Sequence, residues 1–337
     1  MIVSIISPCR NEANYIDAYV TAVLAQRRDG FDIEVLIADG LSNDSTLPKL
    51  EDWACREPRL KVITNPGQIV STGLNLALQH ARGEIIVRMD IHTTYADNYV
   101  AECVKALGET GATCVGGAWV AQGEGFLQRA IAAAFQSRFG SGGAASRRHD
   151  YNGPVDTVYL GAWRRDDLLA IGGFDEALVR NQDDELNLRI IRGGGKVWQS
   201  SAIRSVYTPR GSLAALFRQF HQYGYWKIPV LQKHRLPASA RHVAPFAFLA
   251  LLVVLACAAP FSAAAGVGLA ALAGFYFVAA MWFAMRAGKA ASISDTAAVA
   301  AAFGCMHFGY ASGFGRGIWD FVVLRRRAGA AMKRLTR

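Results

Sequence analysis

The sequence predicts an α/β protein with a mostly parallel sheet sandwiched by helices, followed by a C-terminal helical membrane region. Short apolar runs alternate with amphipathic segments over roughly the first 90 residues. Residues 1–185 hold 25 of the 27 acids, whereas residues 186–337 hold 19 of the 36 Lys and Arg and only two acids. Two uncharged runs of 20 and 23 residues follow one another at 243–262 and 263–285.

The N-terminal elements follow one another in the order βαβαβαβ. We expect strands at 3–7, 33–38, 60–64 and 84–89, and helices at 12–26, 47–55 and 71–80. That order is typical of a parallel sheet covered by helices on both faces. In such sheets, ligands bind beyond the carboxyl ends of the strands. The sequence therefore predicts a ligand site formed by the segments that follow these strands.

Two polar loops lie at these predicted strand ends. The first reads Pro8-Cys9-Arg10-Asn11-Glu12, and the second runs from Asp39 to Thr46 as D-G-L-S-N-D-S-T. Either loop alone reads as a helix cap or an ordinary Gly, Ser and Asp turn. Because they follow consecutive strands, we interpret them together as a nucleotide-binding site.

The segment after the fourth strand carries Asp90-Ile91-His92. In a loop, residues two apart can converge on one cation, and a divalent ion that bridges diphosphate oxygens stabilises a leaving group. Imidazole is a softer ligand than carboxylate, so His92 favours Mn²⁺ relative to Mg²⁺. The alternatives are a phosphate contact or a structural histidine.

A third acidic cluster, Asp183-Asp184-Glu185, precedes the apolar residues of a predicted helix. Acids in a first turn stabilise the helix dipole, and Glu185 and Arg189 are spaced for an i,i+4 ion pair. Three acids are nevertheless more than a helix start requires. One of them is therefore a candidate general base.

Together these segments resemble the family 2 glycosyltransferases, over most of residues 1–230. The resemblance is closest to the membrane-bound succinoglycan-type exopolysaccharide glucosyltransferases, and it implies the GT-A fold. It places Pro8, Arg10, Glu12, Asp39 and Asp90 in the nucleotide-sugar site, with Asp39 on the uracil. His92 departs from the family's usual Asp-x-Asp pattern, and the resemblance implies metal binding by Asp90 and His92.

The family's acidic catalytic pattern falls on Gln182-Asp183-Asp184-Glu185-Leu186. Asp183 then matches the general base, with Asp184 as its chief rival. Gln182 replaces the usual Glu, and the resemblance puts it with Asp184 on the acceptor or donor-sugar side. Trp226 is assigned to the same side, in Tyr225-Trp226-Lys227, because processive synthases carry Gln-x-x-Arg-Trp in this region. The full processive motif is missing here.

The resemblance implies an inverting, metal-dependent, non-processive transferase with Mn²⁺ or Mg²⁺ as cofactor. The expected donor is a UDP-sugar, with glucose or another hexose as the group transferred. The expected acceptor is a lipid-diphosphate-linked oligosaccharide in exopolysaccharide or other cell-surface glycan assembly, alongside other assembly enzymes. The alternatives are a membrane-bound nucleotidyltransferase and a catalytically inactive membrane scaffold.

We expect a catalytic domain at 1–232, with a nucleotide half at 1–115 and an acceptor half at 116–232, then a membrane region at 233–337. Each uncharged run is long enough to cross a bilayer, and a third apolar segment at 296–324 is re-entrant, interfacial or spanning. Basic sequence before the first run predicts contact with anionic lipids rather than nucleic acid. The predicted location is a bacterial inner (cytoplasmic) membrane, multi-pass, with the catalytic domain in the cytoplasm.

Overall fold

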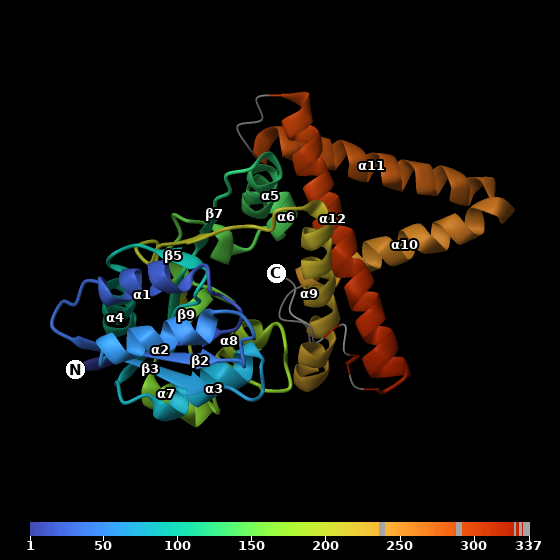
Figure 1. The fold of residues 1–337 in the computed structure, drawn as a ribbon. Coiled ribbons are helices and arrows are strands. Elements are labelled where there is room, and N and C mark those ends of the chain that lie inside the picture. The colour runs from blue at the N-terminus through green and yellow to red at the C-terminus, as the bar shows by residue number, and fades with distance from the viewer. Residues whose placement is uncertain (236–239, 288–291, 327, 330–331, 333–337) are drawn as a thin grey trace. The chain divides into compact units, whose positions relative to one another are not determined.

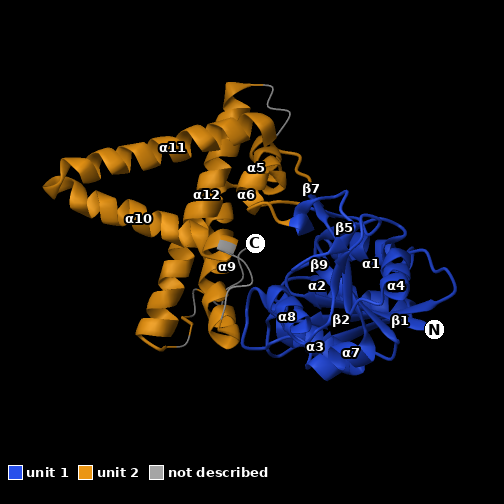
Figure 2. Ribbon diagram, turned by 180° about the vertical axis from the view of Figure 1, so that it is seen from behind, with its two compact units in different colours: residues 1–120, 145–207 blue, residues 121–144, 208–337 orange. Residues whose placement is uncertain are grey.

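A computed structural model of the chain (Figure 1) describes residues 1–235, 240–287, 292–326, 328–329 and 332. The chain divides into two compact units, and each unit combines two separate segments (Figure 2). Unit 1 consists of Met1–Val120 and Ala145–Tyr207, and unit 2 of Ala121–Ala144 and Thr208–Arg337. Helix α9 (Leu213–His234) belongs to unit 2. The functional boundary expected at residue 232 stays a prediction.

Unit 1 contains an eight-stranded sheet in which β1 to β4 are parallel and β9 runs antiparallel to both of its neighbours. The strand order is β3 (Leu60–Thr64), β2 (Asp32–Asp39), β1 (Ile2–Cys9), β4 (Ile85–Arg88), β9 (Tyr159–Arg164), β6 (Cys114–Gly117), β10 (Val197–Gln199) and β8 (Gly153–Pro154). A second sheet has the order β5 (Thr93–Tyr95), β11 (Ser205–Tyr207) and β7 (Trp119–Ala121).

Apolar side chains on the two faces of the large sheet form two buried cores. Along β1, Val3 and Ile5 enter one core and Ile6 enters the other, as the two-residue period of a strand requires. The first core also takes residues of α1 (Ile16–Leu24), α2 (Thr46–Arg56) and α4 (Tyr99–Thr110). The second takes residues of α3 (Val70–His80), α7 (Arg165–Ile171) and α8 (Gln182–Arg192). The predicted sheet sandwiched by helices is confirmed.

Strand register brings the predicted motifs to one edge of this sheet. Cys9, the last residue of β1, is paired with Asp39, the last residue of β2. On the other side of β1, Ile6 is paired with Arg88, the last residue of β4. The loops that follow these three parallel strands therefore leave the sheet at the same edge.

Unit 2 is helical. Its elements are α5 (Phe126–Gln136), α6 (Arg138–Ser141), α9, α10 (Ala244–Ala258), α11 (Ala263–Ala287), α12 (Ile293–Gly317) and a π-helical turn at Ile318–Val323. Helix α12 packs along α9 through three glycines spaced four residues apart. A Cβ at Gly309 would lie 2.8 Å from the carbonyl oxygen of Phe217, one at Gly313 would overlap that of His221, and one at Gly317 would lie 2.8 Å from that of Tyr225.

These glycines allow the two backbones to approach closely, as small residues do in helix pairs within membranes. Successive glycines of α12 contact successive residues of α9 in the same order, from Gly309 with Phe217 to Gly317 with Tyr225, so the two helices run parallel. The segment expected at 296–324 as re-entrant, interfacial or spanning is a continuous helix up to Gly317 that ends in the π-helical turn. Its topology stays a prediction.

Among the residues that the structure describes, two helices are long and apolar enough to cross a membrane, at Ala244–Phe261 and Ala263–Ala287. Both match the spans expected from the sequence. Figure 1 shows them as a helical hairpin, and α10 has no buried residue, while α11 buries only Ala280 and Ala284. Large apolar side chains such as Phe261, Phe275 and Val278 are exposed along this hairpin.

Candidate active site

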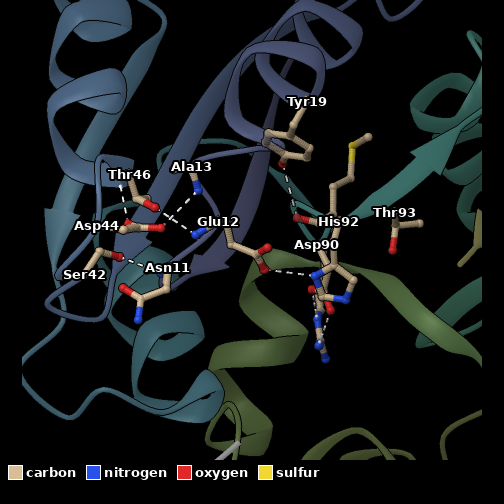
Figure 3. Close-up of polar contacts among 12 residues, drawn as sticks. Asn11, Glu12, Ala13, Tyr19, Ser42, Asp44, Thr46, Asp90, His92 and Thr93 are labelled. Carbon is tan, nitrogen blue, oxygen red and sulfur yellow. Dashed lines mark hydrogen bonds and ion pairs between the residues drawn. The ribbon is translucent and has the colours of Figure 1, made fainter. Parts of the chain in front are cut away.

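The loops after β1 and β2 are held together by backbone-to-side-chain hydrogen bonds (Figure 3). The Asn11 N–H donates to Ser42 Oγ at 2.8 Å, and the Asn43 N–H donates to Asn11 Oδ1 at 2.9 Å. The Glu12 N–H donates to Thr46 Oγ1 at 2.7 Å. The two motifs predicted to act together are therefore one connected structure.

Asp39 ends β2 and is almost fully buried, with 2% of the residue exposed. Its carboxylate accepts the Ser42 N–H at 3.0 Å and the Ser42 hydroxyl at 2.5 Å. A carboxylate has about four acceptor positions, so two bonds leave capacity for a further donor. The side chain of Arg10 lies against Gly40, the residue after Asp39, and Pro8 is paired across the sheet with Ala38, the residue before it.

Arg88 and Asp90 form a buried ion pair with two parallel hydrogen bonds. Arg88 Nε donates to Asp90 Oδ1 at 2.9 Å, and Nη2 donates to Oδ2 at 3.0 Å. Burial lowers the pKa of the Arg88 guanidinium, but the charge of Asp90, the hydrogen bonds to Asp90 and the charge of Asp183 together raise that pKa above its ordinary value. The Tyr95 hydroxyl donates to the Asp90 carbonyl oxygen at 3.0 Å and so also fixes the backbone of this segment.

The side chain of His92 is hydrogen-bonded to the loop after β1. Its Nδ1 lies 3.0 Å from Oε1 of Glu12, a residue that is 3% exposed (Figure 3). The Tyr19 hydroxyl donates to the Met89 carbonyl oxygen at 3.2 Å, on the same segment. Glu12, predicted to be a nucleotide contact, is thus connected to the segment predicted to bind the metal.

Asp183 lies in the first turn of α8 and is half-buried. Burial, and then the like charge of Asp184, raises the pKa of its carboxyl above the ordinary value, while Arg88 acts in the opposite direction. Arg88 is therefore close enough to both Asp90 and Asp183 to interact with each electrostatically. A half-buried carboxyl with a raised pKa is suited to general-base chemistry near neutral pH.

The neighbours of Asp183 have different partners. Asp184 Oδ1 accepts the Thr157 hydroxyl at 3.1 Å, and Thr157 Oγ1 accepts the Asn187 side-chain amide at 3.0 Å. Glu185 is fully buried in an ion pair with Arg189 at 2.7 Å, so it is a structural residue. Gln182 is 7% exposed, and its buried Oε1 accepts no hydrogen bond from the residues that the structure describes.

The donor set suits a cation that is held partly by substrate. Among the described residues, no three His, Cys, Asp or Glu side chains gather as a complete metal site. Mg²⁺ and ions like it are commonly bound by one or two carboxylates together with substrate phosphates. Asp90 and His92, two residues apart, fit that kind of site, although Asp90 would have to share its carboxylate with Arg88.

Trp226 belongs to unit 2, whereas the other predicted site residues belong to unit 1. It is 3% exposed, and its indole N–H donates to the Met332 carbonyl oxygen at 3.0 Å. Its assignment to the acceptor or donor-sugar side stays a prediction.

Sequence reasoning gave no role to Arg88 and Thr157. Arg88 could have been found, because residues two apart at the end of a strand project to the same side and an Arg-x-Asp pair can form there. Thr157 carries no such signal, since it precedes Asp184 by 27 residues.

Comparison with known proteins gives a consistent result. The model of Glycosyl transferase family 2 matches residues 4–170. The succinoglycan biosynthesis protein ExoA of Rhizobium meliloti (strain 1021) is 33% identical over 330 residues, which cover 96% of each chain. A dolichyl N-acetyl-α-D-glucosaminyl phosphate 3-β-D-2,3-diacetamido-2,3-dideoxy-β-D-glucuronosyltransferase of Methanococcus voltae is 25% identical over 263 residues, 74% of this chain and 80% of that protein.

Among solved structures, the mannosyltransferase PcManGT from Pyrobaculum calidifontis, in complex with GDP-Man and Mn²⁺, has the same fold. It aligns with a TM-score of 0.63 at 20% identity, covering 94% of this chain and 87% of that one. The GT-A fold expected from the sequence is confirmed. The chain belongs to glycosyl transferase family 2, and it is a glycosyltransferase similar to the succinoglycan biosynthesis protein ExoA.

Proposed function

We propose that this glycosyltransferase moves one hexose at a time from a UDP-sugar to a lipid-diphosphate-linked oligosaccharide, with inversion at the anomeric carbon. The observation that carries the proposal is the arrangement around Arg88. This buried cation pairs with Asp90 from the nucleotide-side segment and interacts electrostatically with Asp183 at the start of α8. A donor site and a base are thus within reach of one another in unit 1.

The nucleoside is assigned to the joined loops after β1 and β2. Asp39 has acceptor capacity beyond its bonds to Ser42, and the imide N–H of uracil is a donor that matches it. Pro8 and Arg10 lie next to Ala38 and Gly40, the two neighbours of Asp39 in the sequence, and the Glu12 N–H is hydrogen-bonded to Thr46 in the β2 loop. These residues account for the nucleoside side of the donor.

Asp183 is assigned as the general base. It removes the proton of the acceptor hydroxyl as that oxygen bonds to the anomeric carbon, and the bond to the diphosphate breaks with its electron pair leaving on the phosphoryl oxygen. A single displacement of this kind turns an α-linked donor into a β-linked product. Asp184 is the weaker candidate because Thr157 already donates to its carboxylate. Gln182 and Asp184 lie on either side of the base and are assigned to the sugars.

A divalent cation, Mn²⁺ or Mg²⁺, would be held by Asp90 and His92 together with donor oxygens. When bound, such an ion supplies positive charge to the departing diphosphate. Support comes from the donor set and from the solved relative that contains Mn²⁺. His92 already contacts Glu12 through Nδ1, which leaves Nε2 as the nitrogen for the ion.

Membrane attachment is assigned to α10 and α11, whose lengths and apolar surfaces suit a hairpin of two crossings. Residues 186–242 carry ten Lys and Arg and no acid, which suits a surface that faces anionic lipid. The proposed location is the inner membrane, with unit 1 in the cytoplasm, where UDP-sugars are made.

The test is transfer by the full-length protein in detergent or native membranes. A panel of UDP-hexoses and GDP-mannose is supplied with Mn²⁺ and an extract of lipid-linked oligosaccharides, and the new linkage is assigned by NMR. We expect transfer from a UDP-hexose and a β-linked product. An α-linked product from an α-linked donor would refute inversion, and transfer from GDP-mannose alone would refute the UDP assignment.

A further inference from the structure

The guanidinium of Arg88 is buried and only partly paired. Its side chain is 5% exposed, and two of its three nitrogens, Nε and Nη2, donate to Asp90. The third, Nη1, is also buried and has no hydrogen-bond partner among the residues that the structure describes. A charged donor that is buried without an acceptor is costly, so an uncommon arrangement of this kind requires an explanation.

The position of Arg88 suggests what Nη1 binds. Arg88 ends β4 at the edge of the sheet where the nucleotide loops leave β1 and β2, and Asp90 is bound on one side of its planar fork. Arginine remains charged at any physiological pH, and its flat donor geometry matches phosphate oxygens. A sugar hydroxyl could also accept from Nη1, but a charge-assisted hydrogen bond to a diphosphate oxygen is roughly twice as strong.

We propose that Nη1 of Arg88 donates to an oxygen of the distal phosphate of the nucleotide-diphosphate donor, and so distinguishes a nucleoside diphosphate from a nucleoside monophosphate. The inference rests on the proposed function in one respect, that the donor is a nucleotide-diphosphate sugar. It assigns to Arg88 a substrate contact that is separate from base catalysis by Asp183.

This contact has a consequence for the reaction. When the bond between the anomeric carbon and the oxygen of the distal phosphate breaks, its electron pair adds negative charge to that phosphate. A fixed guanidinium beside that oxygen stabilises the developing charge without reorganising, because its other edge is held by Asp90. Arg88 then contributes to transfer as well as to donor binding.

The experiment compares two ligands that differ by one phosphate. UDP and UMP are titrated calorimetrically into full-length wild type and Arg88→Lys, each with Mn²⁺ and again with EDTA. A UDP-hexose is titrated as a third ligand, and transfer by both proteins is assayed in parallel. We expect Arg88→Lys to weaken UDP about tenfold or more while UMP binding changes less than about twofold, since a charge-assisted bond is lost only from UDP. The difference should persist in EDTA, because a guanidinium contact needs no metal.

The matched control is Arg59→Lys. Arg59 forms the same kind of fork with a carboxylate two residues away, with Nε to Glu57 Oε1 at 2.8 Å and Nη2 to Oε2 at 2.6 Å. It precedes β3 and so lies at the opposite end of the strands from the site. Arg59→Lys should bind both nucleotides as wild type does. If Arg88→Lys fails to fold, Arg88→Gln retains an amide donor with no charge to bury and is titrated instead.

Three results would overturn the inference. Equal weakening of UDP and UMP would mean that Arg88 only supports the site. Unchanged UDP binding with weaker UDP-hexose binding would mean that Nη1 contacts the sugar. Unchanged binding of all three ligands with slower transfer would mean that Arg88 acts only through Asp183. By contrast, a folded wild type that binds no nucleoside diphosphate tighter than its monophosphate refutes the proposed function itself.

Discussion

Arg88 holds the carboxylate of Asp90 in a fixed plane through two hydrogen bonds of 2.9 and 3.0 Å, with only Met89 between the two residues. The pair leaves the carboxylate of Asp90 already oriented before any ligand binds. It also means that a cation bound by Asp90 shares that group with a guanidinium. The substitutions below separate the roles of this pair from those of Asp183 and His92.

The first prediction concerns the base. Asp183→Asn should lower kcat about a hundredfold or more with near-normal UDP-sugar binding, since the amide keeps the size but cannot accept the proton. Steady-state transfer and calorimetric donor binding measure the two effects separately. Asp184→Asn is the matched comparison, and it should keep far more activity. The reverse ranking would assign the base to Asp184.

The second prediction concerns stability at neutral pH. The pKa of Asp183 is raised in the folded state, so the folded protein binds more protons than the unfolded chain between the ordinary carboxyl pKa and that raised value. The free energy of unfolding therefore falls as pH rises through this window. Above the raised pKa, the contribution of this group is completely lost. Asp183→Asn removes the ionised group, and its Tm at pH 7 should equal or exceed that of wild type. A clearly lower Tm would contradict the shift.

The third prediction concerns the pH profile of transfer. Activity should fall on the acidic side as Asp183 becomes protonated, with the midpoint of kcat/KM above the ordinary carboxyl pKa. Because Asp184 contributes to the raised pKa through its like charge, Asp184→Asn should move this midpoint to lower pH. A midpoint that stays in place would show that burial alone raises the pKa.

The fourth prediction concerns metal preference. His92→Asp should retain transfer and shift the preference from Mn²⁺ toward Mg²⁺, because carboxylate is a harder ligand than imidazole. Asp90→Asn should abolish the metal-dependent part of donor binding. Rates at graded concentrations of each ion, with Tm as the folding control, give the comparison. An unchanged preference in His92→Asp would assign His92 to the Glu12 contact alone.

The fifth prediction concerns the helix pair of unit 2. Gly313→Ala should lower the stability of the detergent-solubilised protein by about 1–3 kcal/mol, since the new methyl would overlap the His221 carbonyl oxygen. Gly304→Ala on the same helix is the control, because its nearest neighbour, Phe308, lies 4.0 Å from the added carbon. Thermal unfolding should separate the two variants. Equal Tm values would mean that α9 and α12 can move apart at little cost.

The number of membrane crossings can be tested with reporters that are active only outside the cytoplasm. A reporter inserted near Ser262 should give a signal, and one fused after Arg337, a position outside the described residues, should stay silent. Six Lys and Arg between residues 325 and 337 favour the cytoplasmic side. An external signal after Arg337 would indicate that α12 adds a third crossing.

The sequence was sufficient for features that depend on short-range pattern. The short apolar run at Val3 to Ser7 and the order of strands and helices predicted the sheet, and the strand ends then located Asp39 and Asp90. Contacts between residues that are far apart in the sequence could not be predicted. Nothing local in the sequence pairs Glu12 with His92 or Thr157 with Asp184, because such bonds depend on how loops from different strands converge.

The composition of unit 2 also determines how the enzyme can be shortened. Phe135 of helix α5 stacks on Phe220 of α9, with ring centroids 5.7 Å apart. In the sequence, the segment Ala145–Tyr207, which carries Asp183, lies between these two residues. A truncation after Tyr207 would keep α5 in the chain but remove α9 and α12, which pack against it, and would expose Phe135 to water. A soluble fragment should therefore require redesign of residues 121–144 as well as removal of the C-terminal helices, and simple C-terminal truncations should aggregate.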